Sequence, residues 1–277
     1  MNRRPYFSRT FWLILGVSLL ALVLMLIIPL FLGRGEDSSE PIPSAKNPDG
    51  TSRPLALVYR GPAACSDCAE AVAALLQSSQ WHFEVRYVGP GEKLHLSAAL
   101  LKAATLYAQP GSDEDTDLRA AYRLMRSDAP LIRDFVKSGG HYLGFCMGGY
   151  LAGATPGFQL LPGDTKQFIK SPQASVRTTA DTTVQVYWRD QLRTMHFQDA
   201  PYFMVNPDAL NVTVLARYTN DTIAALVTPY GQGRVGVVGP HVEATADWYR
   251  AYNLPAPQQG LTLDLGQDLV NTVMKAG

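Results

Sequence analysis

A cysteine at a glycine-rich junction constrains this chain more than any other feature. Residues 142–145 form a short apolar run that predicts a buried strand, and the small residues after Cys146 predict the start of a helix. Between them, Gly144, Cys146 and Gly148 have the G-x-C-x-G spacing of a nucleophile elbow, a sharp strand-to-helix turn that carries the nucleophile. Such a turn strains the backbone, so its neighbours must lack side chains. Cys146 is therefore a candidate nucleophile, and the alternative is a buried, inert cysteine in a glycine-rich turn.

A histidine follows a second predicted buried strand, residues 234–238, much later in the chain. The sequence there is Gly-Pro-His-Val-Glu, residues 239–243. His241 is placed where a base for an elbow cysteine is needed, and Glu243 can orient and polarise its imidazole. Alternatively, His241 caps the next helix and Glu243 is an acid favoured in its first turn. The two motifs together favour a triad of Cys146, His241 and Glu243.

Predicted strands and helices alternate through the first half of the chain. The strands are residues 55–59, 83–88, 105–108 and 142–145, and the helices are residues 63–77, 96–103, 117–125 and 130–137. This alternation predicts an α/β fold, a parallel sheet flanked by helices, with its active site at the carboxyl ends of the strands. The second half predicts added antiparallel hairpins from residues 158–169, 175–177, 183–188, 192–197, 212–218 and 223–228, with a final helix at 269–274.

The N-terminal part predicts a membrane anchor. Residues 11–32 carry no charge, and at about 1.5 Å per residue they are long enough to cross a bilayer core of about 30 Å. Arginines precede the run and acidic residues follow it, which places residues 1–10 in the cytoplasm and the rest outside the cell membrane, in the periplasm or beyond. Residues 33–54 predict a flexible linker, and residues 55–277 a single domain. A cleaved signal peptide is the alternative.

The composition, the other two cysteines and the histidines indicate which partners, metals and cofactors to expect. The net charge is zero and no long basic stretch occurs, so a nucleic-acid partner is not expected. Cys65 and Cys68 form a C-x-x-C motif, which outside the cytoplasm predicts a disulfide, with a thioredoxin-type redox site as the alternative. The histidines other than His241 show no metal-ligand spacing, so neither a metal nor a cofactor is expected.

The elbow and the late His-x-Glu together resemble the class I glutamine amidotransferase-like superfamily, which has a flavodoxin-like core. The resemblance implies Cys146 as nucleophile, His241 as base and Glu243 as acid. Residues 109–112, Gln-Pro-Gly-Ser, are similar to the Pro-Gly-Gly turn that contributes an oxyanion-hole amide, and this implies Gly111 as one donor. The amide of Met147 is expected to supply the other, as the residue after an elbow nucleophile usually does.

Within that superfamily the chain most resembles the N-terminal domain of biotin-protein ligases. Residues 58–62, Val-Tyr-Arg-Gly-Pro, and residues 239–243 match its motifs, and residues 195–203 match a third one loosely. The resemblance covers residues 55–250. The chain contains no Gly-Arg-Gly-Arg-x-Gly-type loop for biotinyl-adenylate and no room for a ligase domain after Gly277, so biotinylation is not expected.

These features lead to a leading hypothesis and three alternatives. The hypothesis is a membrane-anchored, outward-facing domain that hydrolyses or transfers an amide or acyl group of a small molecule or peptide. The alternatives are a non-catalytic binding or assembly module with an unknown protein partner, a dienelactone-hydrolase-like enzyme with Asp208 or Asp221 as the acid, and a disulfide oxidoreductase acting through Cys65 and Cys68.

Overall fold

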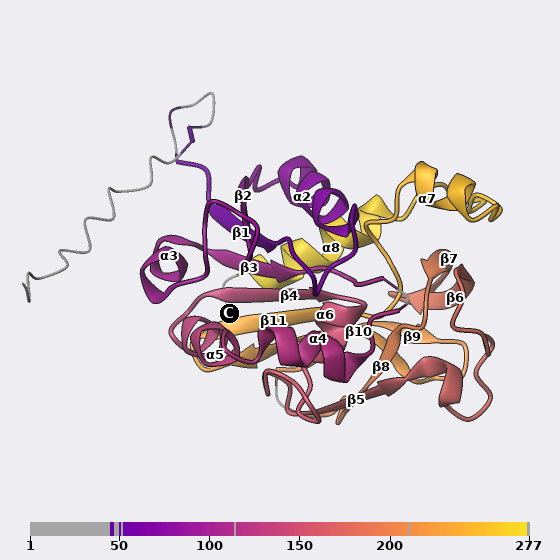
Figure 1. Cartoon of the computed structure of the whole chain (residues 1–277). Coiled ribbons are helices and arrows are strands. Elements are labelled where there is room, and N and C mark those ends of the chain that lie inside the picture. Colours follow the sequence, from indigo (N-terminus) through magenta and orange to yellow (C-terminus); the bar gives the residue numbers. More distant parts are fainter. Residues whose placement is uncertain (1–44, 47–49, 51, 114, 210, 276–277) are drawn as a thin grey trace, which may run out of the picture. The chain divides into compact units, whose positions relative to one another are not determined.

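An eleven-stranded mixed sheet is the centre of the computed structural model, which describes residues 45–46, 50, 52–113, 115–209 and 211–275. Its parallel part has the order β2-β1-β3-β4-β11 (Figure 1). These strands are β1 (Leu55–Tyr59), β2 (Glu84–Val88), β3 (Leu106–Gln109), β4 (His141–Phe145) and β11 (Gly233–Val238). Four of them are almost wholly buried, as expected of apolar parallel strands covered on both faces. The predicted α/β sheet with flanking helices is confirmed.

Helices cover both faces of the parallel strands. α2 and α8 pack on one face, and α5 and α6 pack on the other with α4 beside them (Figure 1). The bounds are α2 (Cys68–Ser78), α3 (Ala98–Ala103), α4 (Leu118–Met125), α5 (Ala129–Lys137), α6 (Met147–Leu151), α7 (Ala246–Ala251) and α8 (Leu263–Met274). Side chains cap the N-termini of α3 and α4. Ser97 accepts a hydrogen bond from the Leu100 amide at 3.2 Å, and Asp117 accepts one from the Ala120 amide at 2.7 Å.

The antiparallel part extends the sheet beyond β11. Its strands follow in the order β10-β9-β6-β7, while β8 pairs with both β10 and β5. The bounds are β5 (Gly163–Gln167), β6 (Thr182–Trp188), β7 (Gln191–Phe197), β8 (Pro201–Val205), β9 (Thr213–Tyr218) and β10 (Ile223–Tyr230), with a 3₁₀ turn at Phe168–Lys170. The predicted antiparallel hairpins are therefore present.

Several predicted strands and helices differ in extent from those of the structure, and the final helix, predicted from residue 269, begins at Leu263. Residues 175–177 are not a strand, because side-chain hydrogen bonds from Arg177 to Ile169 O and from Asn220 to Pro172 O fix this loop instead. Only residues 163–167 of the predicted strand 158–169 pair in the sheet. The helix predicted from residue 63 begins at Cys68, since residues 60–67 form a loop at the sheet edge.

The predicted cytoplasmic segment 1–10 and the predicted anchor 11–32 lie outside the described residues. Among the residues that are described, no helix combines the length and the apolar character that crossing a bilayer requires. Part of the predicted linker 33–54 is described, and it contacts β2. The Ala45 amide donates to Oε2 of Glu84 at 2.6 Å, and Nη2 of Arg53 donates to the Phe83 carbonyl at 2.6 Å.

The carboxyl ends of the parallel strands meet at one edge of the sheet. Phe145 of β4 lies opposite Val238 of β11, and Gln109 of β3 lies opposite Gly144 of β4. The loops that follow these strands contain Gly111, Cys146 and His241. Strand pairing therefore brings residues that are distant in the sequence to one place.

Candidate active site

Cys146 occupies a strained turn between β4 and α6. Its φ is 45° and its ψ is −103°, a region that costs a non-glycine residue about 1–3 kcal/mol. The turn is also crowded: a Cβ on Gly144 would lie 2.4 Å from the Gly148 carbonyl oxygen, and a Cβ on Gly148 would lie 2.0 Å from the Gln109 carbonyl oxygen. Both glycines of the motif are thus required by close backbone approach.

The sulfur of Cys146 is buried beneath the loop between β7 and β8. Only 4% of the residue is exposed, and its Sγ lies 3.4 Å from the Gln198 carbonyl oxygen. The same loop is held from α6, because the Tyr150 hydroxyl donates to the Asp199 carbonyl at 3.1 Å. Cys146 is the free cysteine of the chain.

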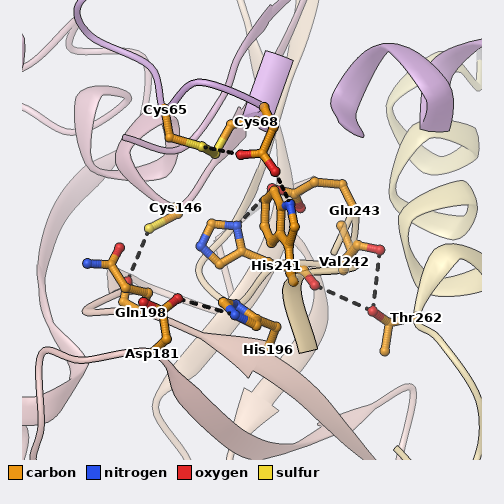
Figure 2. Close-up of polar contacts among 12 residues, drawn as sticks. Cys65, Cys68, Cys146, Asp181, His196, Gln198, His241, Val242, Glu243 and Thr262 are labelled. Atoms are coloured by element: carbon orange, nitrogen blue, oxygen red, sulfur yellow. Dashed lines mark hydrogen bonds and ion pairs between the residues drawn. A yellow bond between two sulfur atoms is a disulfide. The ribbon is translucent and has the colours of Figure 1, made fainter. Parts of the chain in front are cut away.

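His241 and Glu243 lie on the loop that follows β11. Nδ1 of His241 is 2.8 Å from Oε1 of Glu243, and the imidazole lies between Cys146 and Glu243 (Figure 2). The His241 amide donates to the His196 carbonyl at 3.0 Å. The Thr262 hydroxyl lies 3.4 Å and 3.3 Å from the carbonyl oxygens of His241 and Val242. The contacts with His196 and Thr262 fix the backbone of the loop that carries the imidazole.

The electrostatics of this pair favour a charged imidazole. Burial lowers the pKa of His241, but the Glu243 carboxylate and the Cys146 sulfur outweigh it and raise that pKa well above its ordinary value. The Glu243 side chain is fully buried, and its Oε2 has no hydrogen-bond partner among the described residues. Because the Glu243 side chain is buried, its interaction with His241 is stronger than the same contact would be at the surface.

Gly111 lies where the nucleophile, the base and the disulfide meet. A Cβ built on Gly111 would lie 2.9 Å from Cε1 of His241, 3.4 Å from Cβ of Cys146 and 3.6 Å from Sγ of Cys68. The Gly148 amide donates to the Pro110 carbonyl at 3.2 Å, which ties the elbow to this turn. Met147, the other predicted oxyanion donor, is the first residue of α6. The structure thus brings together all five residues predicted for catalysis.

Cys65 and Cys68 form a disulfide at the start of α2 (Figure 2). The Cys65 amide donates to the Gly111 carbonyl at 3.0 Å, and Nε1 of Trp248 donates to the Asp67 carboxylate between the two cysteines. The ligand atoms of Cys65, Asp67 and Cys68 lie within 4.8 Å of one another, a spacing that would suit a metal ion. Both sulfurs are bonded to each other here, so they are not available as thiolate ligands.

A second histidine borders the site and was not predicted from the sequence. Only 2% of His196 is exposed; its Nε2 lies 3.2 Å from Oδ1 of Asp181, and its ring centroid is 5.5 Å from that of His241. Burial lowers the pKa of His196, although Asp181 opposes the shift. The strand β7 brings His196 beside His241 by a bridge between the two backbones. The loose family likeness of residues 195–203 was the signal that could have drawn attention to it.

Two cavities adjoin these side chains. The larger, of about 690 Å³, is lined by His241, His196 and the disulfide, and the smaller, of about 470 Å³, is lined by Cys146 and Met147. Ser112, Asp113, Thr116 and Gln198 line both. The base and the nucleophile therefore line two adjoining cavities.

The acids considered for a dienelactone-hydrolase-like enzyme do not contact the imidazole. Asp221 is 89% exposed and pairs with Arg217 at 3.6 Å, and Asp208 is exposed. Glu243 is the acid that contacts His241.

Residues 55–171 match the model of the family described as biotin-protein ligase, N terminal. The predicted resemblance to this family is confirmed over that range. No curated protein sequence shows significant similarity to the chain.

Solved structures share the fold at low sequence identity. A glutamine amidotransferase from Thermotoga maritima is 14% identical with a TM-score of 0.53, covering 81% of this chain and 97% of its own. A Thermoplasma acidophilum protein named for GMP synthase is 10% identical with a TM-score of 0.52, covering 80% of this chain and 94% of its own. The GH42 β-galactosidase Gan42B is 15% identical with a TM-score of 0.46; the match covers 81% of this chain and only 30% of that longer protein. The first two matches show that this chain shares its fold with those two proteins.

Proposed function

We propose that the chain hydrolyses or transfers an amide or acyl group through a covalent intermediate on Cys146. One observation carries the proposal: the strained cysteine lies at the elbow of β4, and His241 lies between it and the Glu243 carboxylate. A nucleophile, a base in contact with it and an acid that orients the base are the elements of covalent acyl transfer. The raised pKa of His241 supports a proton resting on the imidazole beside Cys146.

The chemistry follows from this arrangement. The Cys146 thiolate attacks the carbonyl carbon, forming a carbon–sulfur bond, and the carbonyl electron pair moves to oxygen. The intermediate collapses with cleavage of the bond to the leaving group, which takes the proton from His241. Water, or an acceptor nucleophile, then gives a proton to His241 and attacks the thioester, releasing the acyl group and restoring the thiolate.

The oxyanion of that intermediate needs hydrogen-bond donors. We assign this role to the backbone amides of Gly111, on the loop after β3, and Met147, at the start of α6, which lie at the same edge of the sheet. The strand order β2-β1-β3-β4-β11 supports a flavodoxin-like core, in which this edge is the usual place for a ligand. The same rim carries Cys146 and His241.

We also propose that residues 11–32 anchor the chain in the cell membrane with the catalytic domain outside. The uncharged run and the arginines before it support this topology. Alkaline extraction of membranes should leave the full chain in the pellet, and protease added to intact cells or spheroplasts should degrade the domain. Release of the chain by alkali would contradict the anchor.

A panel of amides, esters and thioesters presented to the full chain in detergent tests the activity. The wild type should release product, and Cys146→Ser should lose turnover by at least about 10³-fold, as expected when a covalent nucleophile is removed. Release at the same rate in Cys146→Ser would contradict a role for the sulfur. Glutamine belongs in the panel, since the Thermotoga maritima protein that shares the fold is named for it.

The disulfide beside the site favours one other function, that of a thiol–disulfide oxidoreductase. Insulin reduction separates it from the leading proposal. Turnover of insulin that disappears in Cys68→Ala but persists in Cys146→Ser would support the oxidoreductase and contradict acyl transfer.

A further inference from the structure

We propose that Trp248 is a positioning residue for the base: its indole ring packs beside the imidazole of His241, and Asp67 in the disulfide loop holds that ring in place. The inference goes one step beyond the proposed function, because it assigns the orientation of the imidazole to a side chain outside the triad. It rests on the proposed function only for the reaction that the oriented imidazole serves.

The contact between the two rings is the first support. The ring centroids of Trp248 and His241 are 5.3 Å apart and the ring planes are inclined at 76°, which is the geometry of a favourable edge-to-face pair. Both side chains are buried, and both line the larger cavity. Glu243 holds the imidazole at Nδ1, and the indole ring beside it limits how far the imidazole can tilt into that cavity.

The anchoring of the indole ring is the second support. Nε1 of Trp248 donates to Oδ2 of Asp67, a residue that lies 181 positions earlier in the chain. Asp67 is in the short loop that the bond between Cys65 and Cys68 closes. The ring also packs in a small apolar cluster, separate from the main core, with Cys68, Ala71, Ala244 and Tyr249. A hydrogen bond and apolar packing therefore fix the ring that contacts His241.

A second tryptophan makes the same kind of hydrogen bond elsewhere and provides a matched control. Nε1 of Trp188, on β6, donates to Oδ2 of Asp268 at 2.8 Å, and Trp188 is buried like Trp248. Trp188 is not among the described lining residues of either cavity. Replacing it removes the same chemical group, an indole N–H bonded to an aspartate, at a place away from the base.

Several ionisable groups surround the imidazole of His241. They are Glu243, Cys146 and His196 from the elements packed against it, and Asp67, Asp113, Asp115 and Asp181 from the wall of the same cavity. Trp248→Phe changes none of them. Asp67→Asn and Asp67→Ala both remove one carboxylate, but only asparagine keeps an oxygen that can accept the indole N–H. A difference between these two variants therefore reports the hydrogen bond and not the charge.

Nuclear magnetic resonance of the full chain in detergent, isotope-labelled at Cε1 of its five histidines, measures the titration of His241 directly. The signal is assigned from its loss in His241→Ala. Glu243 and Cys146 raise the pKa of His241, so an imidazole that tilts away from them should titrate lower. Trp248→Phe and Asp67→Ala should each lower the midpoint by about half a pH unit or more, while Asp67→Asn and Trp188→Phe should stay close to the wild type.

The rate of iodoacetamide alkylation of Cys146 at pH 6.5 gives a second readout. Trp248→Phe and Asp67→Ala should each slow it about fivefold, the size expected for the loss of one hydrogen bond. The double variant should react no more slowly than either single variant, because both substitutions break the same contact. Trp188→Phe should lower the temperature of thermal unfolding and leave the alkylation rate unchanged, which separates positioning from general stability.

Two results would overturn the inference: an unchanged titration of His241 in Trp248→Phe, or equal titrations in Asp67→Asn and Asp67→Ala. Asp67 is exposed, so its two variants test the contact without disturbing the core. Wild-type alkylation that did not depend on His241 would contradict the proposed function alone. The titration of His241 would still decide the role of Trp248, because it observes the imidazole itself and requires no reaction.

Discussion

Nδ1 of His241 lies 2.8 Å from Oε1 of Glu243, two residues further along the same loop. Base and acid therefore come from one segment, fixed by the end of β11, while Cys146 comes from the neighbouring strand β4. Because β4 and β11 are adjacent and parallel, a single strand pairing brings the three side chains together. The arrangement depends on backbone pairing in the core rather than on a mobile surface loop.

Replacing Glu243 by glutamine should slow the alkylation of Cys146 by iodoacetamide about tenfold or more at pH 6.5. The change removes the carboxylate that raises the pKa of His241, so the imidazole no longer stays protonated beside a thiolate. The rate is measured by mass spectrometry of the alkylated peptide. Asp221→Asn is the control, since Asp221 is exposed and paired with Arg217. An equal effect of both substitutions would contradict Glu243 as the acid.

A methyl group on Gly111 should displace the His241 ring. The added Cβ would lie 2.9 Å from Cε1 of His241, closer than such atoms approach, so Gly111→Ala should lower Cys146 reactivity and any turnover by about 10- to 100-fold. Gly91→Ala is the matched control, because no atom lies within 4 Å of the Cβ it would add. Wild-type reactivity in Gly111→Ala would show that the turn does not position the base.

Reduction of the Cys65–Cys68 disulfide should lower the free energy of unfolding by about 2 kcal/mol, the value expected for closing a very short loop. The measurement is denaturant unfolding with and without dithiothreitol. A variant with Cys65→Ser and Cys68→Ser should match the reduced wild type and show no response to the reductant. If the double variant still lost stability with dithiothreitol, the disulfide would not be the cause.

The docking of α8 should depend on pH through Asp268. Partial burial raises the pKa of this carboxyl, but hydrogen bonds from Arg189 at 2.9 Å and Trp188 at 2.8 Å outweigh it and lower the pKa below its usual range. The stability that Asp268 contributes is therefore present above about pH 3.9, the unfolded value, and lost as the pH falls through the folded value.

Asp268→Asn should accordingly lower the free energy of unfolding by about 1 kcal/mol at pH 6 and by little at pH 3. The loss at pH 6 is small because the Arg189–Asp268 ion pair is partly exposed to solvent. Thermal unfolding at the two pH values checks this. Asp208→Asn, at an exposed acid, should change stability at neither pH. A loss that is the same at pH 3 and pH 6 would show that the carboxylate charge is not what holds α8.

Much of this site could be predicted from sequence because its chemistry lies in short motifs. The elbow around Cys146 and the segment from Gly239 to Glu243 each follow an apolar run, and apolar runs between turn residues are the strongest signal of buried strands. The same apolar runs, alternating with helical segments, also predicted the parallel sheet. The antiparallel hairpins were also predicted, since turn residues such as Arg189 and Asp190 separate the strand-like runs, and both residues have positive φ in the structure.

The contacts that escaped prediction are those between distant segments. His196 reaches His241 only through the register of β7 against the loop after β11, a pairing that no local pattern encodes. β8 was missed because it begins at Pro201, and a proline in a short run argues against a strand unless the strand begins there. The covering of Cys146 by Gln198 likewise depends on how the β7–β8 loop packs on α6.

The rate of iodoacetamide alkylation of Cys146 in the full chain between pH 5.5 and pH 9, compared with His241→Ala, tests the central claim most directly. With the proton held on His241, the wild-type rate should change little between pH 6 and pH 8. In His241→Ala it should fall about tenfold for each pH unit below about 8.5, the ordinary pKa of a thiol. The two curves should therefore separate by more than about tenfold at pH 6.5 and converge near pH 9. Superimposable curves, slow at neutral pH, would contradict the Cys146–His241 pair and with it the proposed enzyme.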